Sequence, residues 1–307
     1  MANTLVVLLG PTGVGKTELS LSLAEFLHCP ILNCDSRQLF ADLKIGTAAP
    51  TAEQQQRVHH FFVGTLALDD YNSAAKYEAD VMELTQKLFQ SYDTLLLSGG
   101  SMMYIDAVCN GIDDIPTISD DVRNHIKNRL NAEGLDALAE ELKELDPTYY
   151  ATADKKNTRR IVHALEVCHM SGRPYSSFLT NQRKKRPFHI IKIGLNRPRE
   201  ELFARINARV DEMMADGLFD EVKAHALQRE CNALNTVGYK ELFKVLDGDW
   251  PLDMAIERIK KNTRVYAKKQ LTWFQRDNSI TWFHPDKIED IIKFLNLKLH
   301  ETETNHS

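Results

Sequence analysis

The segment Gly10-Pro11-Thr12-Gly13-Val14-Gly15-Lys16-Thr17 constrains the fold more than any other part of the chain, because it fits the pattern G-x-x-x-x-G-K-[ST]. The apolar run Thr4–Leu9 comes directly before it. The segment Glu18–Leu27, whose apolar residues recur at helical spacing, comes directly after it. Strand, glycine-rich turn and helix in this order form the first part of a βαβ unit, so we expect a parallel α/β domain.

The chemistry of this turn suits a polyphosphate. Its glycines allow successive backbone N–H groups to face phosphate oxygens, and the helix that follows adds the positive end of its dipole. Lys16 would bring a point charge to the terminal phosphates, and the Thr17 hydroxyl is the usual Mg²⁺ ligand at this position. The flanking strand and helix argue against a chance glycine-rich turn. The motif therefore predicts a bound di- or triphosphate, without specifying a reaction.

Further strands and a helical insertion follow from the distribution of apolar residues. The runs Ile31–Cys34, Thr94–Ser98 and His189–Leu195 read as strands that are buried on both faces. Between them, strand patterns disappear and helical periodicity predicts three helices: Val122–Glu133, Leu135–Leu145 and Thr158–Met170. We therefore expect a P-loop NTPase-like parallel sheet flanked by helices, formed by residues 1–114 and 188–307, with an all-helical insertion domain at 115–187.

The C-terminal third is predicted to be helical. The expected helices are Arg199–Asp216, Phe219–Gln228, Tyr239–Leu246 and Asp253–Gln275. The polar tail Glu301–Ser307 is expected to be disordered.

Asp35 is the acidic residue that stands at the end of a predicted strand. Motor and switch NTPases usually carry an apolar strand that ends in Asp, but here the run Leu95–Ser98 ends in Gly99-Gly100. Ligands bind at the carboxyl ends of parallel strands, so Asp35 would face the phosphate site and could accept a proton or bind a metal ion. The alternative is a helix N-cap formed by Asp35-Ser36. We favour the catalytic role.

The acidic average of the chain hides local basic clusters. The formal net charge is -5, which argues against a protein that coats polyanions in general. Three clusters nevertheless suggest a polyanionic partner such as RNA. They are the lysines and arginines of Ile256–Gln275, the run Arg183–Arg186, and Arg159-Arg160. Arg205 and Arg209, four residues apart on a predicted helix, could clamp departing phosphates, although periodicity alone would place them on the surface.

Other features exclude several classes of protein. The five cysteines are scattered and unpaired in sequence, which argues against a disulfide framework or a zinc site and favours a reducing, cytoplasmic location. His59-His60 are adjacent, which is poor metal-ligand spacing, so a core or interface role is expected. No signal peptide or membrane-spanning stretch is evident in the sequence.

An ordered set of motifs resembles the bacterial tRNA dimethylallyltransferases, from about residue 5 to residue 283. The P-loop alone would be a weak signal, but the order and spacing of the set are highly specific. The set comprises Gly10–Thr17, Asp35-Ser36-Arg37-Gln38, Ile45-Gly46-Thr47-Ala48, Ser98-Gly99-Gly100-Ser101-x-x-Tyr104, Ala164-Leu165-Glu166-Val167, Arg205-x-x-x-Arg209-x-x-x-Met213, Val237-Gly238-Tyr239-Lys240-Glu241, and Thr263-Arg264-x-Tyr266-Ala267-Lys268-Lys269-Gln270-x-Thr272-Trp273-Phe274.

The resemblance implies an activity. Members of that family transfer a dimethylallyl group to N6 of the adenosine just 3′ of the anticodon in tRNA and release pyrophosphate. It implies that the P-loop holds the diphosphate of dimethylallyl diphosphate rather than ATP, together with Mg²⁺ bound through Thr17. It also implies a tRNA anticodon stem-loop as partner, with the insertion as the arm that grips it. We expect a cytoplasmic monomer without membrane contact.

The resemblance also assigns residues. Asp35 would be the general base, with Ser101 close to the nucleophile, and Lys16, Thr17 and Arg209 would stabilise the departing pyrophosphate. The donor diphosphate would lie against Gly10, Pro11, Thr12, Gly13, Val14, Gly15, Lys16 and Thr17. The residues that match positions in contact with tRNA are Asp35, Ser36, Arg37, Gln38, Ser101, Arg123, Arg159, Arg160, Ile161, Val162 and His163.

The chain departs from the family pattern in a few places, and two other functions are compatible with part of the sequence. Asn157 and His163 stand where Asp and Arg are common, and Ala49 replaces a frequent Lys. One alternative is an ATP-dependent kinase of small molecules, which would leave the basic helix unexplained. The other is an RNA-binding module gated by a nucleotide and without catalysis. We expect it to tolerate the loss of the Asp35 carboxylate.

Overall fold

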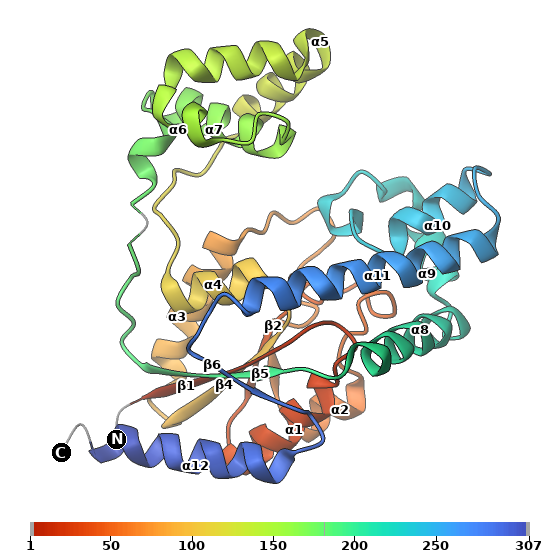
Figure 1. The fold of residues 1–307 in the computed structure, drawn as a ribbon. Helices are drawn as coiled ribbons and strands as arrows, with labels where there is room; N and C mark the ends of the chain where they lie inside the picture. Colours follow the sequence, from red (N-terminus) through yellow and green to blue (C-terminus); the bar gives the residue numbers. More distant parts are fainter. Residues whose placement is uncertain (1–2, 181, 305–307) are drawn as a thin grey trace. The chain divides into compact units, whose positions relative to one another are not determined.

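The computed structural model describes residues 3–180 and 182–304 and divides the chain into two compact units (Figure 1). The larger unit runs to Asn110 and resumes at Lys185, and the smaller unit is Gly111–Lys184. The sequence had placed the corresponding boundaries after residues 114 and 187. Each unit is described here by itself.

The larger unit is built on a six-stranded parallel sheet in the order β3-β2-β4-β1-β5-β6. The strands are β1 (Thr4–Leu9), β2 (Ile31–Cys34), β3 (His60–Phe61), β4 (Thr94–Gly99), β5 (His189–Leu195) and β6 (Ile280–Phe283). The four strands predicted from the sequence are confirmed. The sequence did not predict the edge strands β3 and β6, because two and four residues are too few for a pattern to stand out.

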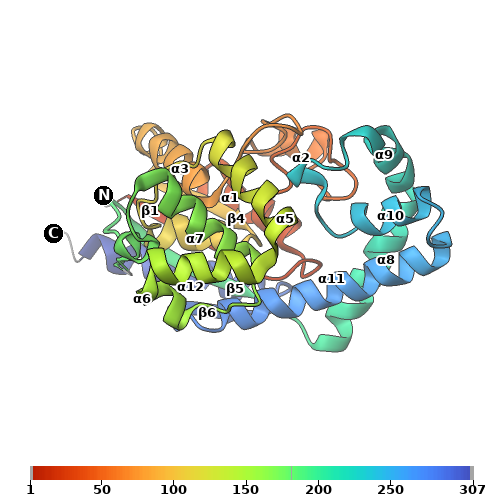
Figure 2. The same cartoon turned by 90° about the horizontal axis from the view of Figure 1, so that it is seen from above.

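Helices lie on both faces of the sheet, as the two views in Figure 1 and Figure 2 show together. The helices of the larger unit are α1 (Lys16–Leu27), α2 (Ala52–Arg57), α3 (Ala74–Leu88), α4 (Met102–Asn110), α8 (Arg199–Ala215), α9 (Leu218–Ala224), α10 (Tyr239–Leu246), α11 (Leu252–Phe274) and α12 (Ile288–Thr304), with short 3₁₀ helices η2 (Ala226–Gln228) and η3 (Asn232–Leu234). Residues of β1 alternate between two cores: Leu5, Val7 and Leu9 belong to the core that includes residues of α3 and α4, whereas Val6 and Leu8 belong to the core that includes residues of α1 and α12. The alternation follows from the period of two in a strand.

Two predictions for the C-terminal third are corrected. The helix expected at Phe219–Gln228 is α9 followed by a separate 3₁₀ turn, because the chain leaves the helical conformation at His225. The tail predicted to be disordered is instead helical up to Thr304, where α12 ends. Ile291 and Leu295 of this helix are fully buried against the sheet, which explains why it forms. The rest of the predicted tail, residues 305–307, lies outside the described residues.

The regular secondary structure of the smaller unit, over its described residues, consists of helices. It contains α5 (Asp120–Leu145), α6 (Pro147–Thr152), α7 (Thr158–Ser171) and η1 (Tyr175–Phe178). Gly134, with a φ of 84° and a ψ of 172°, interrupts α5, in agreement with the two separate helices predicted here. Asp146 is fully buried and holds the end of the bundle, since its carboxylate accepts from the N–H groups of Tyr149 (2.9 Å) and Ser176 (2.6 Å).

Two further expectations concern the cysteines and the membrane. All five cysteines are free thiols, as predicted. Within residues 3–180 and 182–304, no helix combines the length and apolar character needed to cross a membrane.

Candidate active site

The P-loop, residues 10–17, connects β1 to α1 at the carboxyl edge of the sheet. Gly15 is the N-cap of α1 with a φ of 108°, a left-handed conformation that favours glycine. Gly13, with a φ of 79°, lies against α8, and a β-carbon there would come within 2.7 Å of Ile206 Cγ1. The backbone N–H groups in the first turn of α1 have no acceptor within the helix. The loop is therefore shaped to bind an anion with main-chain donors.

The Lys16 ammonium is held by its own loop. Its Nζ donates to the carbonyl oxygens of Gly10 (2.9 Å) and Pro11 (2.8 Å). Burial, together with the charge of Arg209, lowers the pKa of Lys16 from its usual 10.5 to about 7, although the carboxylate of Asp35 opposes this shift. A phosphate that approaches Lys16 would raise this pKa again and charge the side chain where the anion binds.

Three arginines support the P-loop: Arg197 from the connection between β5 and α8, and Arg205 and Arg209 from α8. Arg205 Nε donates to the carbonyl of Gly13 (3.1 Å) and Arg197 Nε donates to that of Val14 (2.9 Å). Arg209 approaches Thr12 Oγ1 (3.5 Å), and burial lowers its pKa. The sequence had paired Arg205 with Arg209 on one helix face and missed Arg197, whose only signal was its place just after a predicted strand.

Asp35 follows β2 and faces the same cleft as the P-loop. Its Oδ1 accepts from the N–H groups of Arg37 (2.9 Å) and Gln38 (3.4 Å), so it stabilises a turn. No helix begins at these described residues, so the alternative of a helix N-cap is wrong, although the side chain makes the same kind of bond to the main chain. Asp35 also lines the cleft together with Lys16 and Arg209. The two roles are therefore compatible in one side chain.

Ser101 and Gln38 hold neighbouring backbone. Ser101 is buried, and its Oγ accepts from the N–H of Ser36 (2.8 Å). Gln38 Nε2 donates to the carbonyl oxygens of Thr47 and Ala48, both at 3.0 Å. In this structure both side chains therefore shape the loops around Asp35.

The P-loop, Asp35, Gln38 and the three arginines line one cleft of about 1350 Å³. Its basic lining residues are Lys16, Lys44, Arg197, Arg205 and Arg209, and its acidic ones are Glu18, Asp35, Glu212, Asp216 and Asp286. Tyr266 of α11 also lines the cleft, and burial raises its pKa to about 12 with a contribution from the charge of Asp35. The cleft thus combines a phosphate cradle, a carboxylate and an aromatic ring, and it is large enough for a sizeable substrate.

The comparison with known proteins decides the family. The family model for IPP transferase matches residues 38–277. The chain belongs to the IPP transferase family. Among its relatives, tRNA dimethylallyltransferase 1 of Bacteroides fragilis is 58% identical over 96% of this chain and 98% of its own. That of Phocaeicola vulgatus is 58% identical over 98% and 100% of the two chains. The family and enzyme class predicted from the sequence are confirmed.

Solved structures agree with this IPP transferase fold. The tRNA isopentenylpyrophosphate transferase of Bacillus halodurans has a TM-score of 0.72 and 34% identity, and the match covers 99% of this chain and 100% of that one. A eukaryotic dimethylallyltransferase solved while acting on tRNA has a TM-score of 0.76, 24% identity and coverage of 89% and 70%, and it supports the fold alone. The predicted α/β class with a parallel P-loop-type sheet is confirmed.

The smaller unit of this IPP transferase carries the other positions predicted to contact tRNA. Arg159, Arg160 and His163 are exposed on the first turns of α7, where Val162 is partly exposed. Arg123, on α5, is also partly exposed. Ile161 is the exception, because its side chain is 0% exposed and packs in the core of the unit. A contact between Ile161 and RNA would therefore have to come from its main chain. Asn157 keeps the helix cap, since its Oδ1 accepts from the N–H of Arg160 (3.3 Å).

The predicted basic clusters are partly neutralised. Arg186 is only 7% exposed in its side chain and forms an ion pair with Glu78 (2.5 Å), so it is a structural residue rather than part of a basic surface. On α11, Lys260 pairs with Asp211 (2.8 Å). Within the described residues, no ion pair with an acidic side chain is present at the other cations of α11, which are Arg258, Lys261, Arg264, Lys268 and Lys269. These side chains remain to attract a polyanion.

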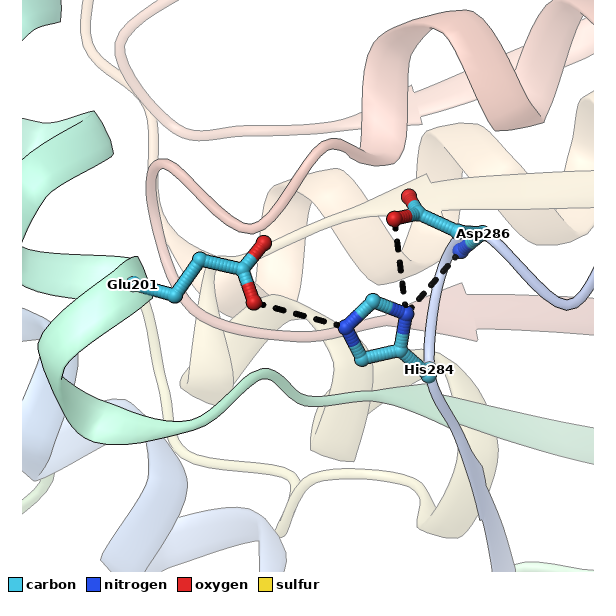
Figure 3. Close-up of side chains that lie close together, drawn as sticks. All are labelled: Glu201, His284 and Asp286. Carbon is cyan, nitrogen blue, oxygen red and sulfur yellow. Dashed lines mark hydrogen bonds and ion pairs between the residues drawn. The ribbon is translucent and has the colours of Figure 1, made fainter.

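One cluster of possible metal ligands occurs within the part of the chain that the structure describes, and it does not suit a metal ion (Figure 3). Glu201 approaches Nε2 of His284 (3.5 Å) and Asp286 approaches Nδ1 (3.7 Å), so the carboxylates lie beside opposite ring nitrogens. Arg197 already pairs with both carboxylates. His59 and His60 are outside this cluster. His60 Nδ1 lies 2.8 Å from the carbonyl oxygen of Val58, and His59 packs edge-on against Phe61.

Proposed function

We propose that the protein transfers a dimethylallyl group from dimethylallyl diphosphate to N6 of the adenosine next to the anticodon of tRNA, on its 3′ side, and releases pyrophosphate. The observation that carries the proposal is that a P-loop and the carboxylate of Asp35 line the same cleft in a member of the IPP transferase family. The names of its relatives, which are tRNA dimethylallyltransferases, supply the acceptor.

The residues of the cleft suggest how the transfer proceeds. The amine N6 attacks the first carbon of the dimethylallyl group, that carbon's bond to the diphosphate oxygen breaks, and Asp35 takes the proton lost from N6. The pyrophosphate carries away the bonding electrons. The N–H groups of the P-loop, with Lys16 and Arg209, are placed to stabilise its charge. The adenine must leave its stack to reach the cleft, at a cost of a few kcal/mol.

The cleft fits a Mg²⁺ ion bound mainly by the substrate. Mg²⁺ usually keeps several waters and takes one or two protein ligands with phosphate oxygens. Thr17, the last residue of the P-loop, could be such a protein ligand because its side chain is exposed and lines the cleft. Bound there, the ion would neutralise charge on the diphosphate.

We extend the proposal to the rest of the tRNA. Ser36, Arg37 and Gln38 in the larger unit, and Arg123, Arg159, Arg160, Val162 and His163 in the smaller unit, are the proposed contacts to the anticodon stem-loop. We further propose that the protein works as a cytoplasmic monomer. The cytoplasmic location is supported by tRNA as the proposed partner.

Incubation with unmodified tRNA, labelled dimethylallyl diphosphate and Mg²⁺ is expected to place label in the RNA. A kinase would instead transfer the γ-phosphate of ATP to a small alcohol, and an RNA-binding module would retain tRNA without labelling it. A matched tRNA with guanosine at the acceptor position serves as control, because it lacks the N6 amine. Absence of label in the adenosine-containing tRNA, beside an active reference enzyme, would refute the proposal.

Removal of Mg²⁺ is expected to lower activity strongly, and Thr17→Val is expected to raise the Mg²⁺ concentration for half-maximal rate by about tenfold, because it removes one oxygen ligand. Thr17→Ser keeps the hydroxyl and should stay within about threefold of the original protein. The measurement is the initial rate against Mg²⁺ concentration. Equal Mg²⁺ dependence in Thr17→Val and the original protein would exclude Thr17 as a ligand.

A further inference from the structure

Gln270 of α11 joins two loops of the cleft through both ends of its side-chain amide. Its Oε1 accepts from the N–H of Thr12 in the P-loop (2.9 Å), and its Nε2 donates to the carbonyl of Gly100 after β4 (2.8 Å). The residue is 2% exposed. Both partners are main-chain groups, and without Gln270 each would lose the hydrogen bond that this buried amide supplies, which is costly.

The two loops joined by Gln270 have different roles in the proposed reaction: one binds the leaving diphosphate, and the other contacts the loop of Asp35. Thr12 belongs to the loop that would hold the leaving diphosphate, and its Oγ1 is the contact of Arg209 (3.5 Å). Gly100 precedes Ser101, whose hydroxyl accepts from the N–H of Ser36, next to Asp35. The chain of contacts therefore runs from the phosphate cradle to the residue that would receive the proton.

The packing around Gly100 shows how closely these loops approach one another. A β-carbon on Gly100 would lie 2.6 Å from Gln270 Nε2, 3.2 Å from the carbonyl oxygen of Gly10 and 3.6 Å from Lys16 Nζ. A side chain at position 100 would press on the Gln270 amide and lie tightly against the P-loop. The pairing of β1 with β4, in register up to Leu9 and Gly99, brings the two loops together. Beyond the ends of these strands, Gln270 is a side chain that joins the loops by a hydrogen bond to each.

We propose that Gln270 is a positioning residue that holds the phosphate cradle and the Asp35 loop at the separation required for group transfer. The inference rests on the function proposed above. Glutamine suits the role because it offers one donor and one acceptor at the required positions. A carboxylate would set an acceptor against the carbonyl of Gly100, and a thioether would satisfy neither partner.

Gln270→Met keeps the length of the side chain and removes both hydrogen bonds. We expect kcat to fall about 10- to 100-fold, because a small misplacement of reacting groups has an effect of this size. The affinity for inorganic pyrophosphate with Mg²⁺, measured by calorimetry, is expected to stay within about threefold, since the P-loop donors themselves remain. Gln275→Met, at the exposed end of the same helix, is the matched control and should keep the original kcat.

The pH dependence of kcat in Gln270→Glu distinguishes a positioning role from a purely structural one. The new carboxyl would be buried beside the carbonyl of Gly100, and these surroundings raise the pKa of a carboxyl. Protonation restores a donor toward Gly100. We therefore expect the ratio of the kcat of Gln270→Glu to that of the original protein to rise by about fivefold or more as the pH falls from 8 to 6. Gln275→Glu should show a flat ratio over this range.

The outcomes separate this inference from the proposed function. If the original protein transfers no label to RNA, the proposed function fails and the inference with it. If the original protein is active and a folded Gln270→Met has a kcat within twofold of it, only the inference is overturned. A flat pH ratio for Gln270→Glu would also overturn it, and this variant decides the matter if Gln270→Met fails to fold.

Discussion

Asp35→Asn is expected to lower kcat for dimethylallyl transfer by about 10²- to 10⁴-fold, which is the usual contribution of a general base. Asparagine keeps an oxygen that can accept from the N–H of Arg37, a bond of 2.9 Å here, so the turn should be preserved while the basic group is lost. Alanine would remove both and confuse the two effects. The measurement is single-turnover transfer together with tRNA affinity, which should change by no more than about threefold, because most single contacts in a large interface contribute little to the binding free energy.

Asp42→Asn is the matched control. Asp42 lies on the same connection between β2 and α2 but is exposed and does not line the cleft. Its variant should transfer at the original rate. A near-normal rate in Asp35→Asn would remove Asp35 from its proposed role, and the proton would then have to be accepted by solvent or by the substrate.

Lys16→Met is expected to lower kcat by about 10²- to 10³-fold, the range seen when one donor to a developing negative charge is removed. The same change should raise the melting temperature at pH 6. The pKa of Lys16 is about 7 in the folded protein and about 10.5 in the unfolded chain. Below pH 7 the buried side chain is charged in the folded protein, so the full cost of burying this charge lowers the free energy of unfolding. Between the two pKa values the unfolded chain binds an extra proton, so the free energy of unfolding rises with pH and the gain from Lys16→Met shrinks. Thermal melts at pH 6 and pH 9 check the sign.

The low pKa of Lys16 also predicts a proton linked to ligand binding. At pH 8 the side chain is largely neutral, and a bound diphosphate should return a proton to it. Calorimetry of pyrophosphate binding in two buffers of different ionisation enthalpy should therefore show proton uptake, which Lys16→Met should lack. Lys87→Met, an exposed residue of α3, is the control and should leave uptake unchanged. Equal uptake in Lys16→Met and the original protein would contradict this account.

Local patterns were sufficient for the framework of the protein. The P-loop motif between an apolar strand and an amphipathic helix predicted the βαβ start, and continuous apolar runs predicted the central strands, because a strand buried on both faces needs no partner to be recognised. Asp35 was found for the same reason: it directly follows such a strand, and the carboxyl ends of parallel strands share one edge.

Tertiary structure decided what depends on distant parts of the chain. Arg186 stands in a basic run, and only the fold places Glu78, 108 residues away, against it. Ile161 matches a position associated with RNA, and only the packing of α5 on α7 shows that it is buried. Helix α12 looked polar at its end, but the sheet supplies an apolar surface that Ile291 and Leu295 cover.

The P-loop could be found from the sequence, whereas the residues that bind its backbone could not. The sequence by itself determined that a phosphate cradle, a strand-end carboxylate and a helical insertion are present, because each is written in neighbouring residues. It did not determine that Gln270 and Arg197 hold that cradle, since these residues lie 258 and 183 positions from their partners in the loop. Hydrogen bonds of this kind form only where the folded chain brings distant segments together. A local sequence pattern does not contain that information.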